Sequence, residues 1–163
     1  MKLYGVTGWK NTGKTGLMER LVTEVSSRGL TVSTIKHAHH DTDIDQPGRD
    51  SHRHREAGAR EVLLSTPRRW ALMHELRGAG EPPLADLLPR LSPVDLVLIE
   101  GYKNEPHPKI EAYRQIIDRP LLASKIETIH AVATDGPVDT ALPVFDLDDT
   151  AAIADFILSE VAR

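Results

Sequence analysis

The segment "GWKNTGKT", which starts at Gly8, constrains the fold of this chain more than any other feature. It matches the pattern G-x-x-x-x-G-K-[ST], in which glycines let the backbone turn closely around phosphate and Lys14 and Thr15 open a helix. The pattern has this meaning only between a buried strand and a helix. Here the apolar "KLYGVT" precedes it, and apolar residues recur with helical spacing over 15–28. The sequence therefore predicts a strand, a phosphate-binding loop and a helix in succession.

The predicted loop carries the groups that a nucleoside triphosphate needs. Backbone N–H groups and the positive end of the helix dipole would face the phosphates. We expect Lys14 to reach the β- and γ-phosphates as a catalytic group, and Thr15 to bind Mg²⁺ through its hydroxyl. Lys10 is either a second cation near the phosphates or a solvated lysine. The predicted nucleotide-binding residues of this segment are Gly8, Trp9, Lys10, Asn11, Thr12, Gly13, Lys14, Thr15 and Gly16.

A magnesium site beside such a loop needs a carboxylate at the end of a neighbouring strand. The apolar run "LVLI" ends at Glu100, and Gly101 follows where the chain must turn near the phosphates. Asp95 lies five residues earlier, near the opposite end of the same predicted strand. We therefore predict Glu100 as a catalytic residue and, with Thr15, as a magnesium ligand. The alternative is an ordinary surface acid at a strand end.

The densest polar segment, residues 36–60, allows two functional interpretations. As a nucleotide switch, it would bring Asp50, Arg53 or Arg55 toward the γ-phosphate, with Asp50 orienting water and His37 as a further contact. As a metal site, it would use imidazole and carboxylate ligands. We favour the switch, and a solvated polar loop is the third alternative. The metal ligands would be His37 and His39, with His40 and Asp41 adjacent, whereas His52 and His130 are expected to be structural or exposed.

Composition and the order of predicted elements define the class of protein. The chain has 163 residues and a net charge of −4, and its length predicts one domain over 1–163. It has no cysteine, so we expect it in the reducing cytoplasm. Its longest apolar run is far below the roughly 20 residues that span a bilayer, and its charge gives no reason to bind nucleic acid. Strands alternate with helices, which predicts an α/β P-loop NTPase fold with a mostly parallel sheet, helices on both faces and a β-hairpin. The strands are expected at 2–7, 31–36, 61–66, 70–76, 94–100, 108–114, 129–135 and 142–147, and the helices at 15–28, 51–59, 84–91 and 148–163.

Several segments together resemble the molybdopterin-guanine dinucleotide biosynthesis adapter family, MobB. They are "GWKNTGKT", "IKHAHHDTDIDQPGRDSHRHREAGA", "WALMHEL", "LVLIEGYK" and "PKIEAYR", and the likeness covers about residues 1–135. It implies a homodimeric GTP-binding protein with weak GTPase activity. It also implies two partners, the molybdopterin guanylyltransferase that joins GMP to molybdopterin and a molybdenum-insertion protein. The residues carried over are Gly8 to Thr15 for phosphate, Thr15 and Glu100 for Mg²⁺, and Asp50 in the switch.

Recognition of guanine is the least distinct part of this pattern. GTP-binding proteins commonly read the base with an aspartate after a late strand, and Asp135 in "HAVATDGP" lies at such a place. The asparagine and lysine of the usual N-K-x-D pattern are absent, and Asp135 is equally suited to form a turn before Gly136. Two other functions stay open: a small-molecule kinase with a lid using Arg68, Arg69 or Arg77, and a metal-delivery GTPase using the histidines.

Overall fold

The structure is a computed structural model that describes residues 1–38 and 43–162. The chain forms two compact units, one made of residues 1–37 and 91–163 and the other of residues 38–90. The first unit contains the phosphate loop, and the second contains most of the polar segment and the hairpin. That these units act as one domain over 1–163 stays a prediction.

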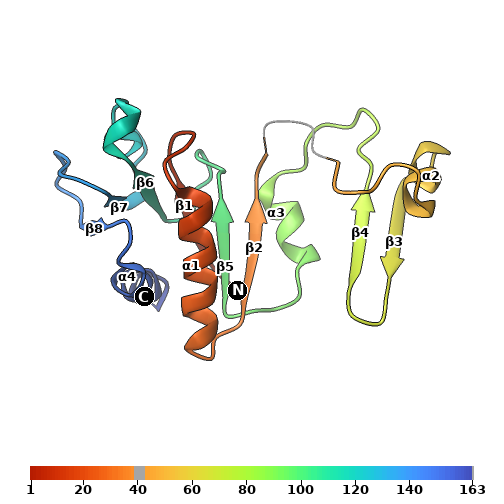
Figure 1. The fold of residues 1–163 in the computed structure, drawn as a ribbon, viewed down its shortest axis with the longest axis horizontal. Coiled ribbons are helices and arrows are strands. Elements are labelled where there is room, and N and C mark those ends of the chain that lie inside the picture. Colours follow the sequence, from red (N-terminus) through yellow and green to blue (C-terminus); the bar gives the residue numbers. More distant parts are fainter. Residues whose placement is uncertain (39–42, 163) are drawn as a thin grey trace. The chain divides into compact units, whose positions relative to one another are not determined.

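A parallel sheet forms the first unit, and its six described strands follow the order β2-β5-β1-β6-β7-β8 (Figure 1). β1 lies between β5 and β6 and pairs in parallel with both. Because parallel strands end at the same edge of a sheet, the loops that follow β1, β5 and β6 leave it side by side. The predicted mostly parallel α/β fold is confirmed. The strands are β1 (Lys2–Thr7), β2 (Val32–Lys36), β5 (Leu96–Glu100), β6 (Lys109–Tyr113), β7 (Ile129–Thr134) and β8 (Val144–Asp146).

Helices α1 (Lys14–Ser27) and α4 (Thr150–Ala162) contact one another and share one hydrophobic core with the sheet. α4 begins as predicted, because the Asp149 carboxylate accepts a hydrogen bond from the Ala152 amide at 3.1 Å. The predicted inward stripe of α4 is buried at Ile153 and Ile157 and only partly buried at Phe156. The fully buried side chains of this core include Tyr4, Val6, Leu17, Leu21, Leu96, Leu98, Ile110, Ile153 and Ile157.

The opposite face of the sheet is polar along β6. Ile110 and Ala112 belong to the helix-side core, so the alternation of a strand turns Lys109 and Glu111 to the other face, where both are fully buried. The Glu111 carboxylate accepts hydrogen bonds from the amides of Leu122 at 2.9 Å and Ala123 at 2.8 Å. These amides open the 3₁₀ helix η3 (Leu122–Ser124), so a short helix is fixed to this face of the sheet.

A buried histidine lies beside these charges. The Lys109 ammonium donates to the carbonyl of His107 at 2.7 Å, to Thr128 Oγ1 at 3.0 Å and to the Glu105 carbonyl, so its donors are satisfied. Neither His107 ring nitrogen has a hydrogen-bond partner among the described residues. Burial, with a smaller effect of Lys109, lowers the pKa of His107 to about 4. Gly5 is required here, because a Cβ would lie 2.8 Å from His107 Nε2.

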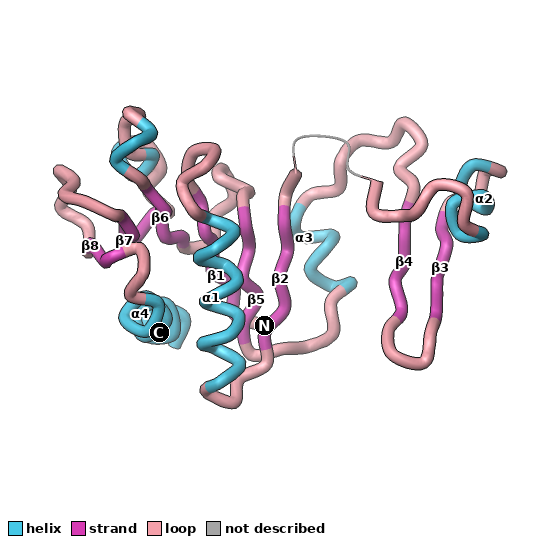
Figure 2. The backbone as a smooth tube through the Cα atoms, viewed as in Figure 1, coloured by secondary structure: helices cyan, strands magenta, loops and turns pink. Residues whose placement is uncertain are grey.

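The second unit contains a small helix and the predicted hairpin. α2 (Asp50–Glu56) is shorter than predicted. β3 (Glu61–Ser65) pairs antiparallel with β4 (Trp70–His74), and Figure 2 shows the loop that joins the two strands. The Thr66 hydroxyl donates to the Arg69 carbonyl at 2.8 Å, which closes the turn between the strands. The unit also holds α3 (Leu84–Leu87) and η1 (Leu88–Arg90), and η2 (Gln115–Ile117) completes the first unit. No helix of the described chain has the length and apolar character needed to cross a membrane.

We predict that His107 makes stability depend on pH. The unfolded chain binds a proton near the ordinary pKa of 6.5, whereas the folded chain binds it only near 4. The contribution of neutral His107 to the free energy of unfolding is therefore fully present above pH 6.5. It is lost as the pH is lowered toward 4, by roughly 3 kcal/mol at most. Urea unfolding at pH 7, 5.5 and 4.5 should show this fall in the native protein and a shallower one in His107→Leu.

His54→Leu is the matched control, because His54 is exposed in α2. This variant should keep the pH dependence of the native protein. Identical pH profiles for the native protein and His107→Leu would contradict the assignment.

Candidate phosphate-binding site

The loop between β1 and α1 has a backbone that its glycines make possible. Gly8 has φ 145°, and a Cβ there would lie 2.3 Å from the Ala112 carbonyl oxygen of β6. Asn11 and Gly13 also adopt positive φ, at 66° and 88°. Gly13 is the N-cap of α1 and gives no side-chain cap, so the first amides of this 14-residue helix are left for a ligand. The predicted strand, loop and helix are therefore present, with the helix beginning at Lys14.

Trp9 organises the loop from its centre. Its carbonyl oxygen accepts hydrogen bonds from Thr12 Oγ1 at 2.9 Å and from the Lys14 ammonium at 2.5 Å. Its indole nitrogen donates to the Pro120 carbonyl at 2.8 Å, which ties the loop to the segment after β6. The ammonium of Lys103 and the guanidinium of Arg119 lie 5.0 and 5.5 Å from the centre of its ring. These contacts hold Lys14 within the loop.

Charged side chains of both signs act on Lys14. Its pKa is lowered mainly by burial and further by the charges of Lys103 and Lys36, while Glu100 acts in the opposite direction. Such an arrangement favours an anion, because a phosphate would relieve the repulsion among the cations. Lys36 and Lys103 are functional candidates that the sequence reasoning missed. The signal was available, since each follows or ends a strand at the same edge as the loop.

Thr15 and Glu100 lie together, as the magnesium prediction requires. Thr15 Oγ1 is 3.5 Å from Glu100 Oε1, and Lys36 Nζ is 3.6 Å from the same oxygen. The three residues line an open pocket of about 450 Å³ beside α1. A hydroxyl and a carboxylate suit Mg²⁺, which usually keeps several of its waters, so these donors fit the ion. Asp95 instead accepts hydrogen bonds from Thr31 at the opposite end of β5, which supports the choice of Glu100.

His37 adjoins this carboxylate through the backbone. Its amide donates to the Glu100 carbonyl at 2.9 Å, and its ring stacks on Tyr102 with 4.5 Å between centroids. Gly101, which lies between Glu100 and Tyr102 in the sequence, has φ 95°, and a Cβ there would lie 3.0 Å from the Cβ of His37. His39, His40 and Asp41 of the metal alternative lie outside the described residues. Within the described ranges, no three metal-binding side chains gather into a site.

The predicted switch residues belong to the second unit. Arg55 is held there by carboxylates, with Nη2 2.9 Å from Asp43, Nε 3.1 Å from Asp45 and Nη1 2.7 Å from Glu75. Arg53 and Asp50 form a looser pair at 3.9 Å on α2. Arg55 is thus fixed as a structural centre of its own unit, a role that the sequence reasoning did not foresee. Contacts of these residues with phosphate stay predictions.

Asp135 is committed to a structural hydrogen bond. Its Oδ1 accepts the amide of Gln115 at 2.9 Å, and the Gln115 side chain donates to the Pro137 carbonyl at 2.7 Å. These bonds join the loops after β6 and β7. Its reading of guanine stays a prediction.

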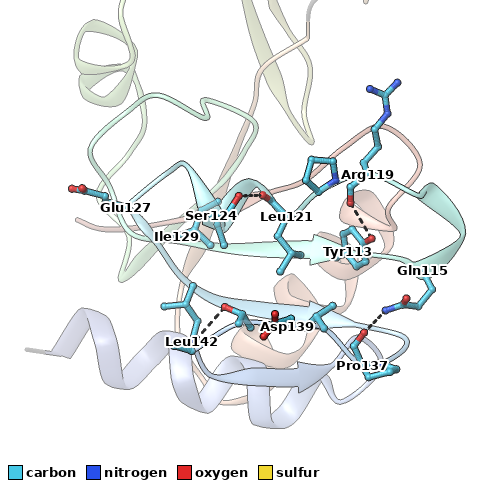
Figure 3. Close-up of a pocket in the computed structure, with 15 residues that line it drawn as sticks. Tyr113, Gln115, Arg119, Leu121, Ser124, Glu127, Ile129, Pro137, Asp139 and Leu142 are labelled. Carbon is cyan, nitrogen blue, oxygen red and sulfur yellow. Dashed lines mark hydrogen bonds between the residues drawn. The ribbon is translucent and has the colours of Figure 1, made fainter.

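A wide groove of about 760 Å³ lies between these same loops (Figure 3). Several polar groups on its walls are bonded to the backbone of the walls: Tyr113 Oη donates to the Arg119 carbonyl at 3.0 Å, and Ser124 Oγ to the Leu121 carbonyl at 2.7 Å. The groove also has Arg119, Glu127 and Asp139 on its walls, whereas the phosphate loop offers an uncapped helix terminus together with Lys14 and the oxygens of Thr15 and Glu100. The loop is the better candidate site.

Comparisons with known proteins agree with this arrangement. The family described as "Molybdopterin guanine dinucleotide synthesis protein B" matches residues 3–135. The chain is 41% identical over 158 residues to the molybdopterin-guanine dinucleotide biosynthesis adapter protein of Haemophilus influenzae, covering 95% of this chain and 86% of that protein. It is 36% identical to the Escherichia coli protein of the same name, covering 96% and 91%.

Solved structures give the same result. A crystal structure of a MobB homologue from Bacillus stearothermophilus is 31% identical and superposes with a TM-score of 0.73 over 99% of both chains. A crystal structure of a molybdopterin-guanine biosynthesis protein B is 26% identical, with a TM-score of 0.77 over 97% of this chain and 99% of that one. The predicted resemblance is therefore confirmed, and the chain belongs to the MobB family.

Proposed function

We propose that this chain is a GTP-binding adapter with weak GTPase activity that assists molybdopterin guanine dinucleotide biosynthesis in the cytoplasm. The adapter role follows from membership of the MobB family. The observation that carries nucleotide binding is the uncapped start of α1, where Lys14 opens the helix and the Thr15 hydroxyl lies 3.5 Å from the Glu100 carboxylate. GTP is favoured over other triphosphates because the relatives' names place them in the synthesis of a guanine nucleotide.

Different residues of the site would bind the phosphates and the metal ion of a nucleotide. Inward backbone amides and the Lys14 ammonium would hold the β- and γ-phosphates, and moving Lys14 from the Trp9 carbonyl to phosphate exchanges a neutral acceptor for a charged one. Thr15 and Glu100 would hold Mg²⁺, which neutralises phosphate charge when bound. Asp50 is the residue that we expect to orient the attacking water.

The kinase alternative finds little support. Arg77 donates to the carbonyls of Arg55 at 2.7 Å and Ala59 at 2.9 Å, so it stabilises its own unit. Arg68 and Arg69 lie in the hairpin turn, which the Thr66 hydroxyl closes. The metal-delivery alternative depends on His37 and on His39, which lies outside the described residues. Its test is stoichiometric nickel or zinc that is lost in a His37→Ala, His39→Ala double variant.

We also propose that the hairpin joins two copies of the chain. Leu63 and Leu72 are cross-strand neighbours and Trp70 lies two residues from Leu72, so all three point to one face. They are 60%, 42% and 63% exposed. An isolated two-stranded hairpin with an apolar face is marginally stable in water, and a second copy would cover that face. The molybdopterin guanylyltransferase and a molybdenum-insertion protein are the further partners that the adapter role implies.

Nucleotide binding is tested by calorimetric titration with GTP and then ATP, with and without Mg²⁺. Lys14→Ala should weaken GTP binding by at least about 2 kcal/mol, because a charge-assisted contact is lost. Glu100→Gln should weaken binding only when Mg²⁺ is present, because it acts through the ion. Lys10→Ala is the matched control for loop charge, and a small effect would identify Lys10 as a solvated lysine. Unchanged affinity in Lys14→Ala would refute the phosphate assignment.

The dimer is tested by light scattering during gel filtration. The native protein should have twice the 18.0 kDa mass of one chain. Leu72→Glu should shift it to the monomer, because a charge on the covered face would be buried without a partner. Ile116→Glu is the control, since Ile116 is 85% exposed in the first unit, and it should stay dimeric. A monomeric native protein, or a dimer that survives Leu72→Glu, would contradict the hairpin interface.

A further inference from the structure

Arg114 lies against the phosphate loop on the side away from the magnesium residues. It directly follows β6, whereas Glu100 ends β5, and β1 with its loop lies between these two strands. A Cβ on Gly13 would lie 3.1 Å from Arg114 Nε and 3.4 Å from Leu147 Cδ2. The last loop residue before α1 is therefore bordered by a guanidinium and by the start of the loop after β8.

The Arg114 guanidinium is free to serve a ligand. Its side chain is half-buried, and among residues 1–38 and 43–162 no carboxylate or carbonyl pairs with it. Its donors are therefore available to a planar or anionic ligand. The other arginines near the site differ from it in this respect. Arg119 lies over Trp9, and Arg20 is bonded to Thr150 and Leu147.

The proposed binding of the phosphates determines where the nucleoside part of the nucleotide would lie. If the β- and γ-phosphates lie at Lys14 and the ion at Thr15 and Glu100, the remainder of the nucleotide would extend over Gly13 toward the ends of β6, β7 and β8. The loops there, residues 114–118, 135–143 and 147–149, contain no phenylalanine, tyrosine or tryptophan. A flat heterocycle therefore has no aromatic ring from these loops to stack on. A guanidinium is planar and stacks well on such rings.

The loop that carries Arg114 is fixed by its neighbours. Asp135 Oδ1 accepts the amide of Gln115 at 2.9 Å. The Gln115 side chain donates to the Pro137 carbonyl at 2.7 Å, as Figure 3 shows. Gly136 is required for this contact, because a Cβ would lie 2.7 Å from Gln115 Cγ. Asp135 thus orients the residue next to Arg114.

We propose that the Arg114 guanidinium stacks on the nucleobase of the bound nucleotide, and that Asp135 is a positioning residue that holds Arg114 in place through Gln115. This inference rests on the proposed nucleotide binding and adds to it the group that contacts the base. It differs from a base read by the Asp135 carboxylate itself. The nucleoside contributes affinity through the plane of Arg114, and the phosphates contribute through the loop.

Binding of GTP and of inorganic tripolyphosphate, both with Mg²⁺, separates these contributions in the full chain. Arg114→Ala should lose at least about fivefold in GTP affinity, the lower end of what stacking on a base contributes, and keep its tripolyphosphate affinity. Arg114→Lys should lose GTP affinity as well, because it keeps the charge and lacks the plane. Arg68→Ala, which removes the same charge from the hairpin turn, should leave both affinities unchanged.

Two results would overturn the stacking role while leaving nucleotide binding intact. One is an unchanged GTP affinity in Arg114→Ala. The other is an equal loss for GTP and tripolyphosphate that Arg114→Lys restores, because that pattern identifies a phosphate contact. A native protein that binds neither ligand would overturn the proposed function, and this inference with it.

Asp135 variants test the positioning role. Asp135→Asn keeps an oxygen for the Gln115 amide and should retain GTP affinity and its preference over XTP. Asp135→Ala should lose GTP affinity and keep tripolyphosphate affinity, and its circular dichroism spectrum should match that of the native protein. A transfer of preference to XTP in Asp135→Asn would overturn the role, because xanthine presents an acceptor that the new amide group recognises directly.

Discussion

Close contact between Gly8 and the Ala112 carbonyl of β6 is the constraint on which the rest of the site depends. A side chain at Gly8 would need the space of that oxygen, so only glycine lets the chain leave β1 this close to the neighbouring strand. The loop then turns back through Asn11 and Gly13 and starts α1 without a side-chain cap. The open amides of that helix are a consequence of the tight exit.

Parallel pairing converts this local geometry into a site. β1 has β5 on one side and β6 on the other, and all three strands end at one edge. The two sides carry different chemistry: Glu100 and Lys36 lie at the ends of β5 and β2, and Arg114 follows β6. This asymmetry gives a nucleotide a direction, with metal and terminal phosphates on the β5 side and the base on the β6 side in our proposal.

Buried charges on the polar face of the sheet hold the segments that connect β5, β6 and β7. Lys109 ties the segment after Glu100 to Thr128, and Glu111 holds η3, from which the chain returns to β7. Burial of these charges is costly, and Lys109 accordingly has its pKa lowered to about 8 by desolvation. Their hydrogen bonds fix two irregular crossovers that no long helix covers. In the second unit, Arg55 of α2 forms ion pairs with three carboxylates and so joins α2 to the segment before it and to the residue after β4.

The sequence by itself determined the strands, the loop, α1, the hairpin and the position of Glu100 at a strand end, because glycine spacing and hydrophobic periodicity are local properties of the chain. It also carried the family, through segments as distinctive as "LVLIEGYK". The tertiary structure alone brings Arg114 and Lys103 to the loop and gives Arg55 and Asp135 their hydrogen-bond partners. These contacts depend on which residues far apart in sequence meet at a strand end, and neither periodicity nor motif spacing contains that information.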